Sequence, residues 1–333
     1  MSIFEINPDI RQANTLSAEF YTDEKYFEAS KEKIFARSWH LVDRIDNTVN
    51  LRPVNILDTP ILISNDNGNL TCLSNVCTHR GAILVEENCH KNGIRCRYHG
   101  RRFDLQGKFL SMPEFENVEN FPSENDNLPK IPFGVWCDFI FASLNPFAPL
   151  DDFLAEMKKT VKLPLRLNLT QIKDYEVNAH WALYCENYLE VFHVPFVHQG
   201  LNSVIDYGTY TTETFRYSSL QTAYDDNGSL AAHYFFIFPN LMFNFYPWGV
   251  SVNIVKPITS NKTTVTYLTF VTDQSKVGVG AGGDLETVEL EDQAIVESVQ
   301  KGIRSRFYDT GRYSPTREQG THHFQRLICE FMS

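Results

Sequence analysis

Two pairs of cysteine and histidine are the residues of this chain whose types and spacing are best suited to chemistry. Cys77 and His79 lie in the sequence CTHRG, and Cys96 and His99 follow in the sequence CRYHG. Sixteen residues separate the first pair from the second, which is the length of a loop connection. Thiolates and imidazoles are strong ligands for transition metals. We therefore expect the two pairs to ligate one metal centre from two neighbouring hairpin loops.

The ligand types fit two kinds of centre. Two cysteines and two histidines suit a structural zinc ion, but zinc sites usually pair cysteine with cysteine and histidine with histidine along the chain. Here each pair mixes the two residue types, and each histidine leads into a turn, Arg80-Gly81 or Gly100-Arg101. This favours a [2Fe–2S] cluster of the Rieske type, in which histidines replace cysteines on one iron. Such a cluster transfers single electrons.

A second metal site is predicted in the sequence ENYLEVFHVPFVH. His193 and His198 are five residues apart, so a straight helix would place them on different faces. Pro195 lies between them and predicts a helix end or a kink that turns both rings toward one point. Glu190 is three residues before His193 and is expected on the same helical face.

Two histidines and one carboxylate form the facial triad of a mononuclear iron(II) oxygenase, which leaves positions open for O₂ and substrate. Residues 285–305 have the longest uninterrupted helical pattern and supply acidic side chains. Spacing alone does not choose among five of them, which are Glu286, Glu289, Glu291, Asp292 and Glu297.

The elements that must position these residues change character along the chain. Residues 15–40 have the apolar spacing of helices, and short apolar runs separated by turns predict strands from residue 40 to about 147. Prolines and a pair of aspartates near residue 150 mark a boundary. Further helices and strands are predicted beyond it, over 150–162, 166–180, 206–272 and 285–305. We predict an α+β chain with a helical segment at 1–39, a metal-cluster β domain at 40–149 and a catalytic domain at 150–333.

Composition excludes several classes of function. The chain of 333 residues has a formal net charge of −11 and no basic run, which argues against binding to nucleic acid or anionic membranes. No segment approaches the roughly 20 apolar residues that span a bilayer, and the N-terminus has no signal-peptide pattern. The five cysteines outside the predicted cluster are dispersed and odd in number, which is typical of a reducing cytoplasm.

The metal motifs together with EDQAIVESVQKG resemble the α subunit of Rieske non-haem iron oxygenases. More narrowly, PNLMFNFYPWG at 239–249 and YDTGRYSPTREQGTHHF at 308–324 resemble the choline monooxygenase branch, near the oxygenases of glycine betaine and carnitine. The resemblance implies a Rieske β domain joined to a helix-grip catalytic domain with an antiparallel sheet and a long C-terminal helix. It also implies a homotrimer that receives electrons from NAD(P)H through a separate reductase or ferredoxin.

The same resemblance assigns residues that spacing left open. It places Asp292 as the carboxylate ligand of the iron, and Glu190 as the acid that connects cluster and iron across a subunit interface. The chain departs from the family pattern at His180, where Asn is usual, at Ala182, where Lys is usual, and at Arg101, where Trp is common. None of these departures removes a ligand.

Aromatic residues near the iron motif predict the substrate pocket, and they are Tyr188, Phe192, Phe196, Phe243, Phe245, Tyr246 and Trp248. Aromatic faces attract quaternary ammonium groups by about 0.5–2 kcal/mol each. The resemblance implies hydroxylation or N-demethylation of a quaternary ammonium compound such as choline or a betaine, which such a pocket permits, and an aromatic substrate is the alternative that the pocket would hold equally. An electron-transfer protein would leave the second metal motif without a purpose, and a sensor built on an inactive oxygenase would not need its intact ligands.

Overall fold

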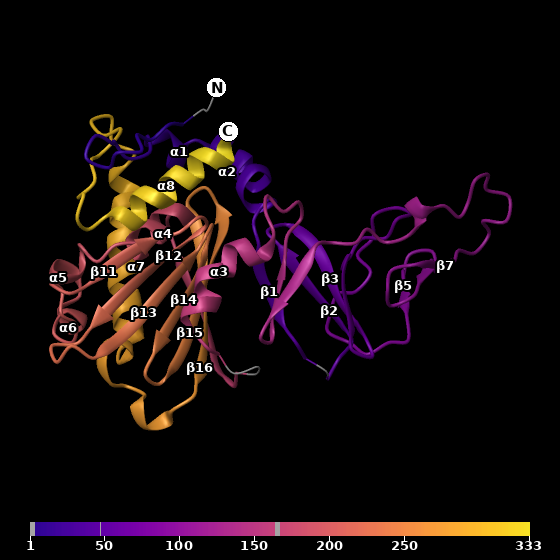
Figure 1. Ribbon diagram of the computed structural model, residues 1–333. Coiled ribbons are helices and arrows are strands. Elements are labelled where there is room, and N and C mark those ends of the chain that lie inside the picture. The colour runs from indigo at the N-terminus through magenta and orange to yellow at the C-terminus, as the bar shows by residue number, and fades with distance from the viewer. Residues whose placement is uncertain (1–3, 47, 164–166) are drawn as a thin grey trace. The chain divides into compact units, whose positions relative to one another are not determined.

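The computed structural model describes residues 4–46, 48–163 and 167–333. These residues form two compact units (Figure 1), one over 36–147 and one over 148–333 together with the N-terminal segment through Phe35. The boundaries predicted from the sequence lie at 39/40 and 149/150. No helix within the described ranges is long and apolar enough to cross a membrane.

Three small antiparallel sheets build the unit over 36–147. Their strand orders are β1-β9-β8, β2-β3-β4 and β5-β6-β7. The strands are β1 (His40–Arg44), β2 (Leu51–Ile56), β3 (Thr59–Asp66), β4 (Asn69–Ser74), β5 (Ile94–Arg95), β6 (Arg102–Phe103), β7 (Phe109–Ser111), β8 (Phe133–Trp136) and β9 (Phe139–Ala142). The turn between β3 and β4 is made by Asn67 and Gly68, whose φ values of 52° and 96° suit a two-residue hairpin loop. A 3₁₀ turn at Glu124–Asp126 precedes β8.

One apolar core of this unit lies directly under the predicted cluster loops. Cys77 and Cys96 are both buried in it, against Leu73, Phe103 and Leu128. Because protein interiors are close-packed, this core fixes the backbone from which the cluster loops project.

A seven-stranded antiparallel sheet, in the order β10-β16-β15-β14-β13-β12-β11, is the centre of the other unit. Its strands are β10 (Leu169–Val177), β11 (Thr211–Thr214), β12 (Ser218–Tyr224), β13 (Leu230–Ile237), β14 (Leu241–Tyr246), β15 (Gly249–Thr259) and β16 (Lys262–Val271). The predicted strand start at 166 lies outside the described residues.

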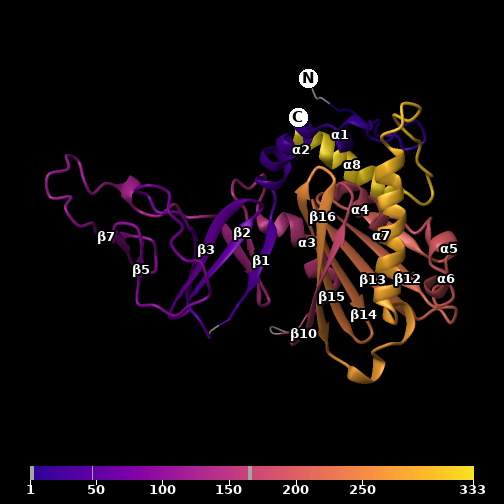
Figure 2. The ribbon, with the colours of Figure 1, turned by 180° about the vertical axis from the view of Figure 1, so that it is seen from behind.

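Helices cover this sheet, and the longest of them runs along one face (Figure 2). The helices of this unit are α1 (Glu19–Thr22), α2 (Glu24–Ser30), α3 (Leu150–Thr160), α4 (Trp181–Tyr188), α5 (Val194–Val197), α6 (Gln199–Asn202), α7 (Leu285–Gly302) and α8 (Gln319–Met332). Short 3₁₀ turns at Gln274–Lys276 and Gly280–Gly282 lead into α7. Helix α4 packs against β15, α7 and α8, so the residues that follow α4 come close to the buried face of α7.

The helical prediction for residues 15–40 was too simple, because the segment divides into α1, α2 and a π-helical turn at Lys31–Phe35. Asp23 separates the two helices and caps α2, since its side chain accepts a hydrogen bond from Lys25 N at 3.0 Å. Helix α8, whose face carrying Leu327, Ile328 and Phe331 is buried, was not predicted from the sequence.

His180, one of the departures from the family pattern, caps α4. Its Nδ1 accepts a hydrogen bond from Ala182 N at 3.3 Å, which is the role an asparagine side chain has at a helix start. Burial lowers the pKa of His180 to about 3, so the ring is neutral and Nδ1 keeps the lone pair that the cap needs.

Candidate metal centres

The two predicted Cys–His loops have the same backbone geometry. In each loop the cysteine N–H donates to the carbonyl five residues ahead, at 2.8 Å from both Cys77 and Cys96. The glycine four residues ahead donates back to the cysteine carbonyl, at 3.0 Å for Gly81 and 3.1 Å for Gly100. Both glycines have φ values in the left-handed region, 72° and 75°, which glycine adopts at least cost. The chain thus presents one cysteine and one histidine from each of two matched loops.

The side chains of these loops fit an iron–sulfur cluster. The His79 and His99 ring centroids are 4.8 Å apart, while Cys77 and Cys96 are 3% and 2% exposed. His99 Nδ1 is buried and has no hydrogen-bond partner within the described part of the chain. A buried nitrogen without a partner is costly, and ligation of a metal ion through that atom would satisfy it.

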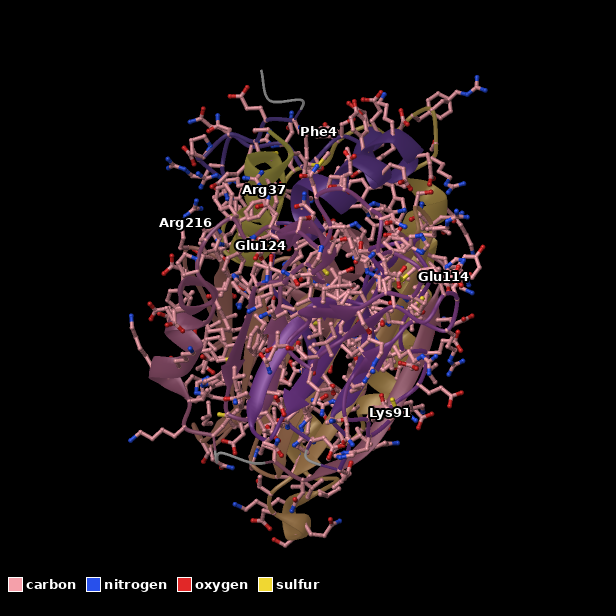
Figure 3. The ribbon with its side chains drawn as sticks, turned by 90° about the vertical axis from the view of Figure 1, so that its right-hand side faces the viewer. Phe4, Arg37, Lys91, Glu114, Glu124 and Arg216 are labelled. Carbon is pink, nitrogen blue, oxygen red and sulfur yellow. The ribbon has the colours of Figure 1, made fainter. Side chains whose placement is uncertain are left out.

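Arg101, the residue after the second loop's glycine, is a buried cation beside these side chains. Lys91, Glu114 and Glu124 of the same unit are exposed (Figure 3), whereas Arg101 is 2% exposed and is, like Arg52 at 3%, a buried arginine of this unit. Its guanidinium forms an ion pair with Asp126 at 2.5 Å. Burial raises the pKa of the Cys77 thiol, and the positive charge of Arg101 is among the influences that oppose this rise.

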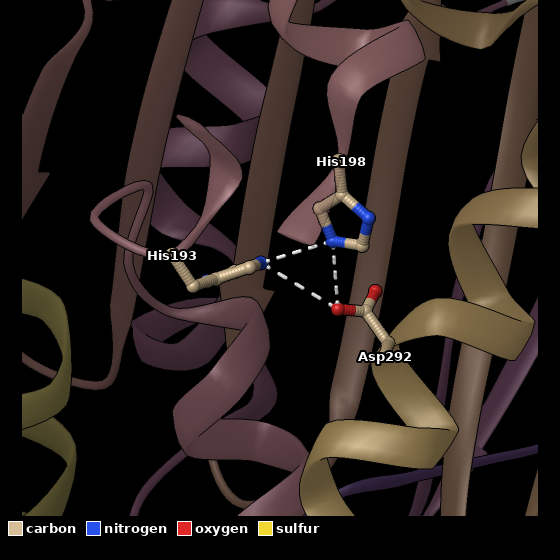
Figure 4. Close-up of side chains that lie close together, drawn as sticks. All are labelled: His193, His198 and Asp292. Carbon is tan, nitrogen blue, oxygen red and sulfur yellow. Dashed lines mark hydrogen bonds and ion pairs between the residues drawn. The ribbon is translucent and has the colours of Figure 1, made fainter. Parts of the chain in front are cut away.

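The second predicted site brings three side chains together at the end of α4 and the face of α7 (Figure 4). His193 and His198 are the residues immediately before and after α5, and Asp292 lies on α7. His198 Nε2 is 3.1 Å from His193 Nε2 and 2.9 Å from Asp292 Oδ1. The third distance, between His193 Nε2 and Asp292 Oδ1, is 3.5 Å. These three residues are a group able to hold a metal ion.

The local structure around the histidines differs from the expected helix in two ways. Helix α4 ends at Tyr188, so Glu190 and His193 lie in the following loop and do not share a helical face. Pro195 lies in the first turn of α5, where a missing N–H costs nothing, so it begins a helix and does not kink one. One short helix separates the two histidines and turns their rings toward each other.

Carboxylates outside the triad orient both rings. Glu190 Oε1 is 2.6 Å from His193 Nδ1, and Glu291 Oε2 is 2.7 Å from His198 Nδ1. A carboxylate only accepts hydrogen bonds, so each Nδ1 donates and each Nε2 turns toward the shared centre. Carboxylate–histidine–metal chains of this kind are a common arrangement in metalloproteins.

The three converging donor atoms attract a cation. Although burial opposes the change, hydrogen bonds with Asp292 and Glu190 raise the pKa of His193 to about 9. Burial would raise the pKa of Asp292. The hydrogen bonds and charges of the two histidines outweigh burial, so the pKa of Asp292 is lowered. A metal ion would satisfy the same atoms by displacing the proton. The donor set of two imidazoles and one carboxylate therefore fits an iron(II) ion.

The structure distinguishes among the five acidic residues of α7. Glu286 pairs with Lys173 at 2.6 Å, and Glu297 accepts a hydrogen bond from Asn178 N at 2.9 Å. Glu289 accepts hydrogen bonds from the hydroxyls of Tyr184 and Tyr267. Only Asp292, among these five, faces both histidines, while Glu291 contacts the outer nitrogen of His198.

Two residues of the site were missed by the sequence analysis as positioning groups. Asn187 Nδ2 donates to Asp292 Oδ1 at 2.5 Å and holds the carboxylate in place. Glu291 was considered only as a possible ligand, although it orients His198. Asn187 is three residues before Glu190 in the same motif, but nothing in its spacing pointed to a partner 105 residues away.

A cavity adjoins the three converging side chains and is lined by six tyrosines, Tyr184, Tyr188, Tyr210, Tyr234, Tyr246 and Tyr267. Glu190 and Asp292 also line it, and its described lining includes no lysine, arginine, phenylalanine or tryptophan. It is therefore an aromatic cavity whose charged groups, apart from the two histidines, are acidic.

Two of the seven aromatic residues predicted for the pocket, Tyr188 and Tyr246, line this cavity. Phe192 and Phe196 are instead 44% and 79% exposed. Trp248 is buried behind Tyr246, with the two rings stacked at 5.0 Å.

Strand alternation explains the placement of the other two aromatic residues. Side chains on β14 alternate between the faces of the sheet, and Asn244 and Tyr246 are the members that line the cavity. Phe243 and Phe245 consequently lie on the other face, where Phe245 packs against Phe235 at 6.1 Å between ring centroids. The sequence pattern showed alternation but did not show which phase faced the metal site.

Comparisons with known proteins agree with this architecture. Residues 38–122 match the family described as Rieske [2Fe-2S] domain, and residues 212–333 match the family described as ring hydroxylating alpha subunit (catalytic domain). The oxygenase subunit of carnitine monooxygenase from Escherichia coli (strain K12) is 30% identical, covering 98% of this chain and 96% of that protein. Chloroplastic choline monooxygenase from Arabidopsis thaliana is 28% identical, covering 98% and 85%.

Solved structures of Rieske oxygenases are also similar to this chain. The quaternary ammonium Rieske monooxygenase CntA in complex with L-carnitine superposes with a TM-score of 0.81 at 27% identity, covering 98% of this chain and 97% of that one. Naphthalene 1,2-dioxygenase with bound indole has a TM-score of 0.77 at 18% identity, covering 96% and 92%, and is alike in fold. The predicted α+β fold, with a Rieske β domain and a helix-grip catalytic domain, is confirmed. This chain belongs to the Rieske-type oxygenases and is an oxidoreductase that incorporates oxygen from O₂.

Proposed function

We propose that this oxygenase hydroxylates, or oxidatively N-demethylates, a small quaternary ammonium compound such as choline or a betaine. The observation that carries the proposal is the cavity beside His193, His198 and Asp292, with its six tyrosines and its acidic groups. Aromatic faces attract an alkylated ammonium group that cannot donate hydrogen bonds. The relatives named for choline and carnitine support the same substrate class.

The residues of the two centres have separate roles in this proposal. Cys77, His79, Cys96 and His99 hold the [2Fe–2S] cluster, and His193, His198 and Asp292 hold the iron. Iron in this site would supply the reductive activation of O₂, with one oxygen atom entering a C–H bond of the substrate and the other leaving as water. Glu190 and Glu291 hold the histidine rings in position through Nδ1, and the tyrosines hold the substrate's cationic end beside the metal-binding atoms.

Electrons reach the cluster, in our proposal, from NAD(P)H through a separate reductase or ferredoxin. Glu190 then connects the iron site of one subunit with the cluster of its neighbour in a homotrimer, as the family resemblance implies. The hydrogen bond that His193 Nδ1 donates to Glu190 supports one half of this bridge. None of the seven cysteines, all of which lie within the described ranges, forms a disulfide, which suits the cytoplasm as the location.

An aromatic substrate is the second candidate. Aliphatic side chains, among them Val191, Leu201 and Ile205, also line the cavity and could contact an uncharged ring. The two candidate substrates differ in charge. A quaternary ammonium substrate carries a positive charge, and an aromatic substrate need not.

Substrate-coupled O₂ uptake decides between them. The protein, reconstituted with a surrogate reductase, would be given choline, glycine betaine, carnitine, stachydrine and simple arenes. The uncharged isostere of choline, 3,3-dimethyl-1-butanol, is the matched control because it keeps the shape and removes the charge. We expect coupling with an ammonium compound and little with the isostere. Coupling with arenes alone would reject the ammonium substrate and leave the oxygenase assignment intact.

A further inference from the structure

The ion pair between the buried Arg101 and the partly buried Asp126 is a feature of the cluster-binding unit that the proposed function does not use. Arg101 occupies a position where the family commonly has an uncharged tryptophan. Its carbonyl accepts the hydrogen bond from Cys96 N at 2.8 Å, so the residue is part of the second cluster loop. Its side chain is 2% exposed, which removes the screening by water that weakens surface charges.

Three aromatic rings enclose the guanidinium. Arg101 Cζ lies 4.9 Å from the ring centroid of Phe109, 5.6 Å from that of Phe121 and 5.7 Å from that of Phe103. Such rings stabilise the cation without neutralising it. Arg101 Nε is buried with no hydrogen-bond partner in the described ranges, and the one carboxylate paired with the group is that of Asp126. The Asp126 carboxylate therefore balances the single charge of the guanidinium, and removal of either partner leaves the charge of the other without its counter-ion.

Asp126 connects this cation to the first cluster loop. Its backbone carbonyl accepts hydrogen bonds from Arg101 Nη2 at 3.1 Å and from Thr78 Oγ1 at 2.9 Å. Thr78 lies between the two ligands of the first loop, Cys77 and His79. The Asp126 carboxylate is itself held by Ser123, whose N and Oγ lie 2.7 Å and 3.0 Å away. The two charges are thus held in place against both loops.

We propose that Arg101 and Asp126 set the reduction potential of the cluster, with Arg101 raising it and Asp126 lowering it. The inference rests on the proposed cluster ligands. Uptake of one electron makes the cluster one charge more negative, so a nearby cation stabilises the reduced form and a nearby anion destabilises it. These effects are large where water is excluded, and charge and hydrogen bonding around a cluster are known to tune its potential.

The rival explanation is that the ion pair only holds the two loops together. The two explanations predict different signs for the shift in reduction potential when each partner is replaced. If the pair only holds the loops together, replacing either partner loosens the same contact and has the same kind of effect. If the charges act on the cluster, Arg101→Gln lowers the potential and Asp126→Asn raises it. Arg101→Lys keeps the charge and changes the hydrogen bonding. Its reduction potential should therefore remain closer to that of the wild type than the potential of Arg101→Gln does.

The test is a reductive titration of the purified holoprotein with dithionite and redox dyes, followed by the cluster's visible absorption and its electron paramagnetic resonance signal. We expect opposite shifts in the two variants, each changing the one-electron reduction constant by roughly tenfold, or about 59 mV. Arg97→Gln is the matched control, because Arg97 lies in the same loop but is 78% exposed and should shift the potential much less.

The outcomes separate the inference from the proposed function. Absence of a Rieske spectrum in the wild type would reject the cluster ligands themselves. An intact spectrum with shifts of the same sign, or with no shift, would overturn the role of the charge pair. If Arg101→Gln fails to assemble the cluster, Asp126→Asn still decides, since a potential that stays unchanged or falls contradicts the proposal.

Discussion

Both carboxylate oxygens of Glu190 contact a single residue, His193. Oε1 is 2.6 Å from the ring nitrogen Nδ1, and Oε2 accepts a hydrogen bond from the backbone nitrogen at 3.1 Å. One side chain therefore holds both the ring and the backbone that carries it. This relationship gives Glu190 a positioning role within its own subunit, in addition to the bridge between subunits that we propose for it.

Replacement of Glu190 should weaken metal binding at the triad. Loss of a carboxylate behind a metal-ligating histidine typically costs about 10–100-fold in metal affinity, and we expect Glu190→Gln to fall in that range. Glu190→Asp keeps the charge but shortens the reach, so it should lose one of the two contacts. Titration of iron-depleted protein with Fe(II) measures the affinity. Glu291→Gln is the comparison, because Glu291 is more exposed, 37% against 13%, and should matter less.

Removal of a triad ligand should abolish one metal site and spare the other. With His198→Ala or Asp292→Asn, we expect iron content to fall from about three to about two per chain, since the cluster keeps its own two irons. The cluster absorption should be unchanged and substrate-coupled O₂ uptake should be lost. Three irons in either variant would mean that the third iron is bound elsewhere.

The glycines of the cluster loops should be required for cluster retention. Gly100→Ala forces a side chain into the left-handed region, at a cost of about 1–2 kcal/mol, in a backbone that presents Cys96 and His99. The expected result is a lower iron–sulfur content. Gly228→Ala is the matched control, because Gly228 has nearly the same φ, 76° against 75°, and open space around it. Equal cluster loss in both variants would show that general instability is responsible.

The tyrosine cavity predicts a ring-specific effect on substrate binding. Tyr246→Phe keeps the aromatic face and should change the KM for the ammonium substrate little. Tyr246→Leu removes the face and should raise the KM by about 2- to 30-fold, which corresponds to roughly 0.5–2 kcal/mol. Phe245→Leu, one residue away on the opposite face of β14, serves as the control. A similar rise in KM for Phe245→Leu would contradict the assigned strand phase.

Glu289 should make stability depend on pH. Burial raises its pKa from 4.5 to about 7, and hydrogen bonds from Tyr184 and Tyr267 oppose the rise. Between these values the folded protein retains a proton that the unfolded chain has released. Stability should therefore fall as pH rises from 4.5 to 7, by at most about 1.4 kcal/mol per pH unit.

Thermal unfolding of wild type and Glu289→Gln at pH 5 and pH 8 tests this expectation. The variant has no ionisable group at this position, so its stability relative to the wild type should improve at the higher pH. A difference between the two proteins that is the same at both pH values would show that Glu289 does not titrate in this range.

Some of the site could be predicted from the sequence because its geometry is local. Each Cys–His pair lies within one loop that is closed by its own backbone hydrogen bonds, so residue types and spacing were enough to propose the cluster ligands. His193 and His198 are likewise connected by one short helix. The strands and the long helix α7 were predicted for a similar reason, because the periodic spacing of apolar residues that indicates them lies within one continuous segment of sequence.

Only the tertiary structure decided which distant residues meet. Asp292 and Glu291 are adjacent on α7, and the packing of that helix turns one toward both imidazoles and the other toward a single outer nitrogen. Likewise, the side chains of β14 alternate between two faces of the sheet. The packing of the sheet determines that Tyr246 lines the cavity and that Phe245 lies on the other face. Local spacing determines which residues can act together, whereas the rotation of a helix and the phase of a strand follow from long-range burial.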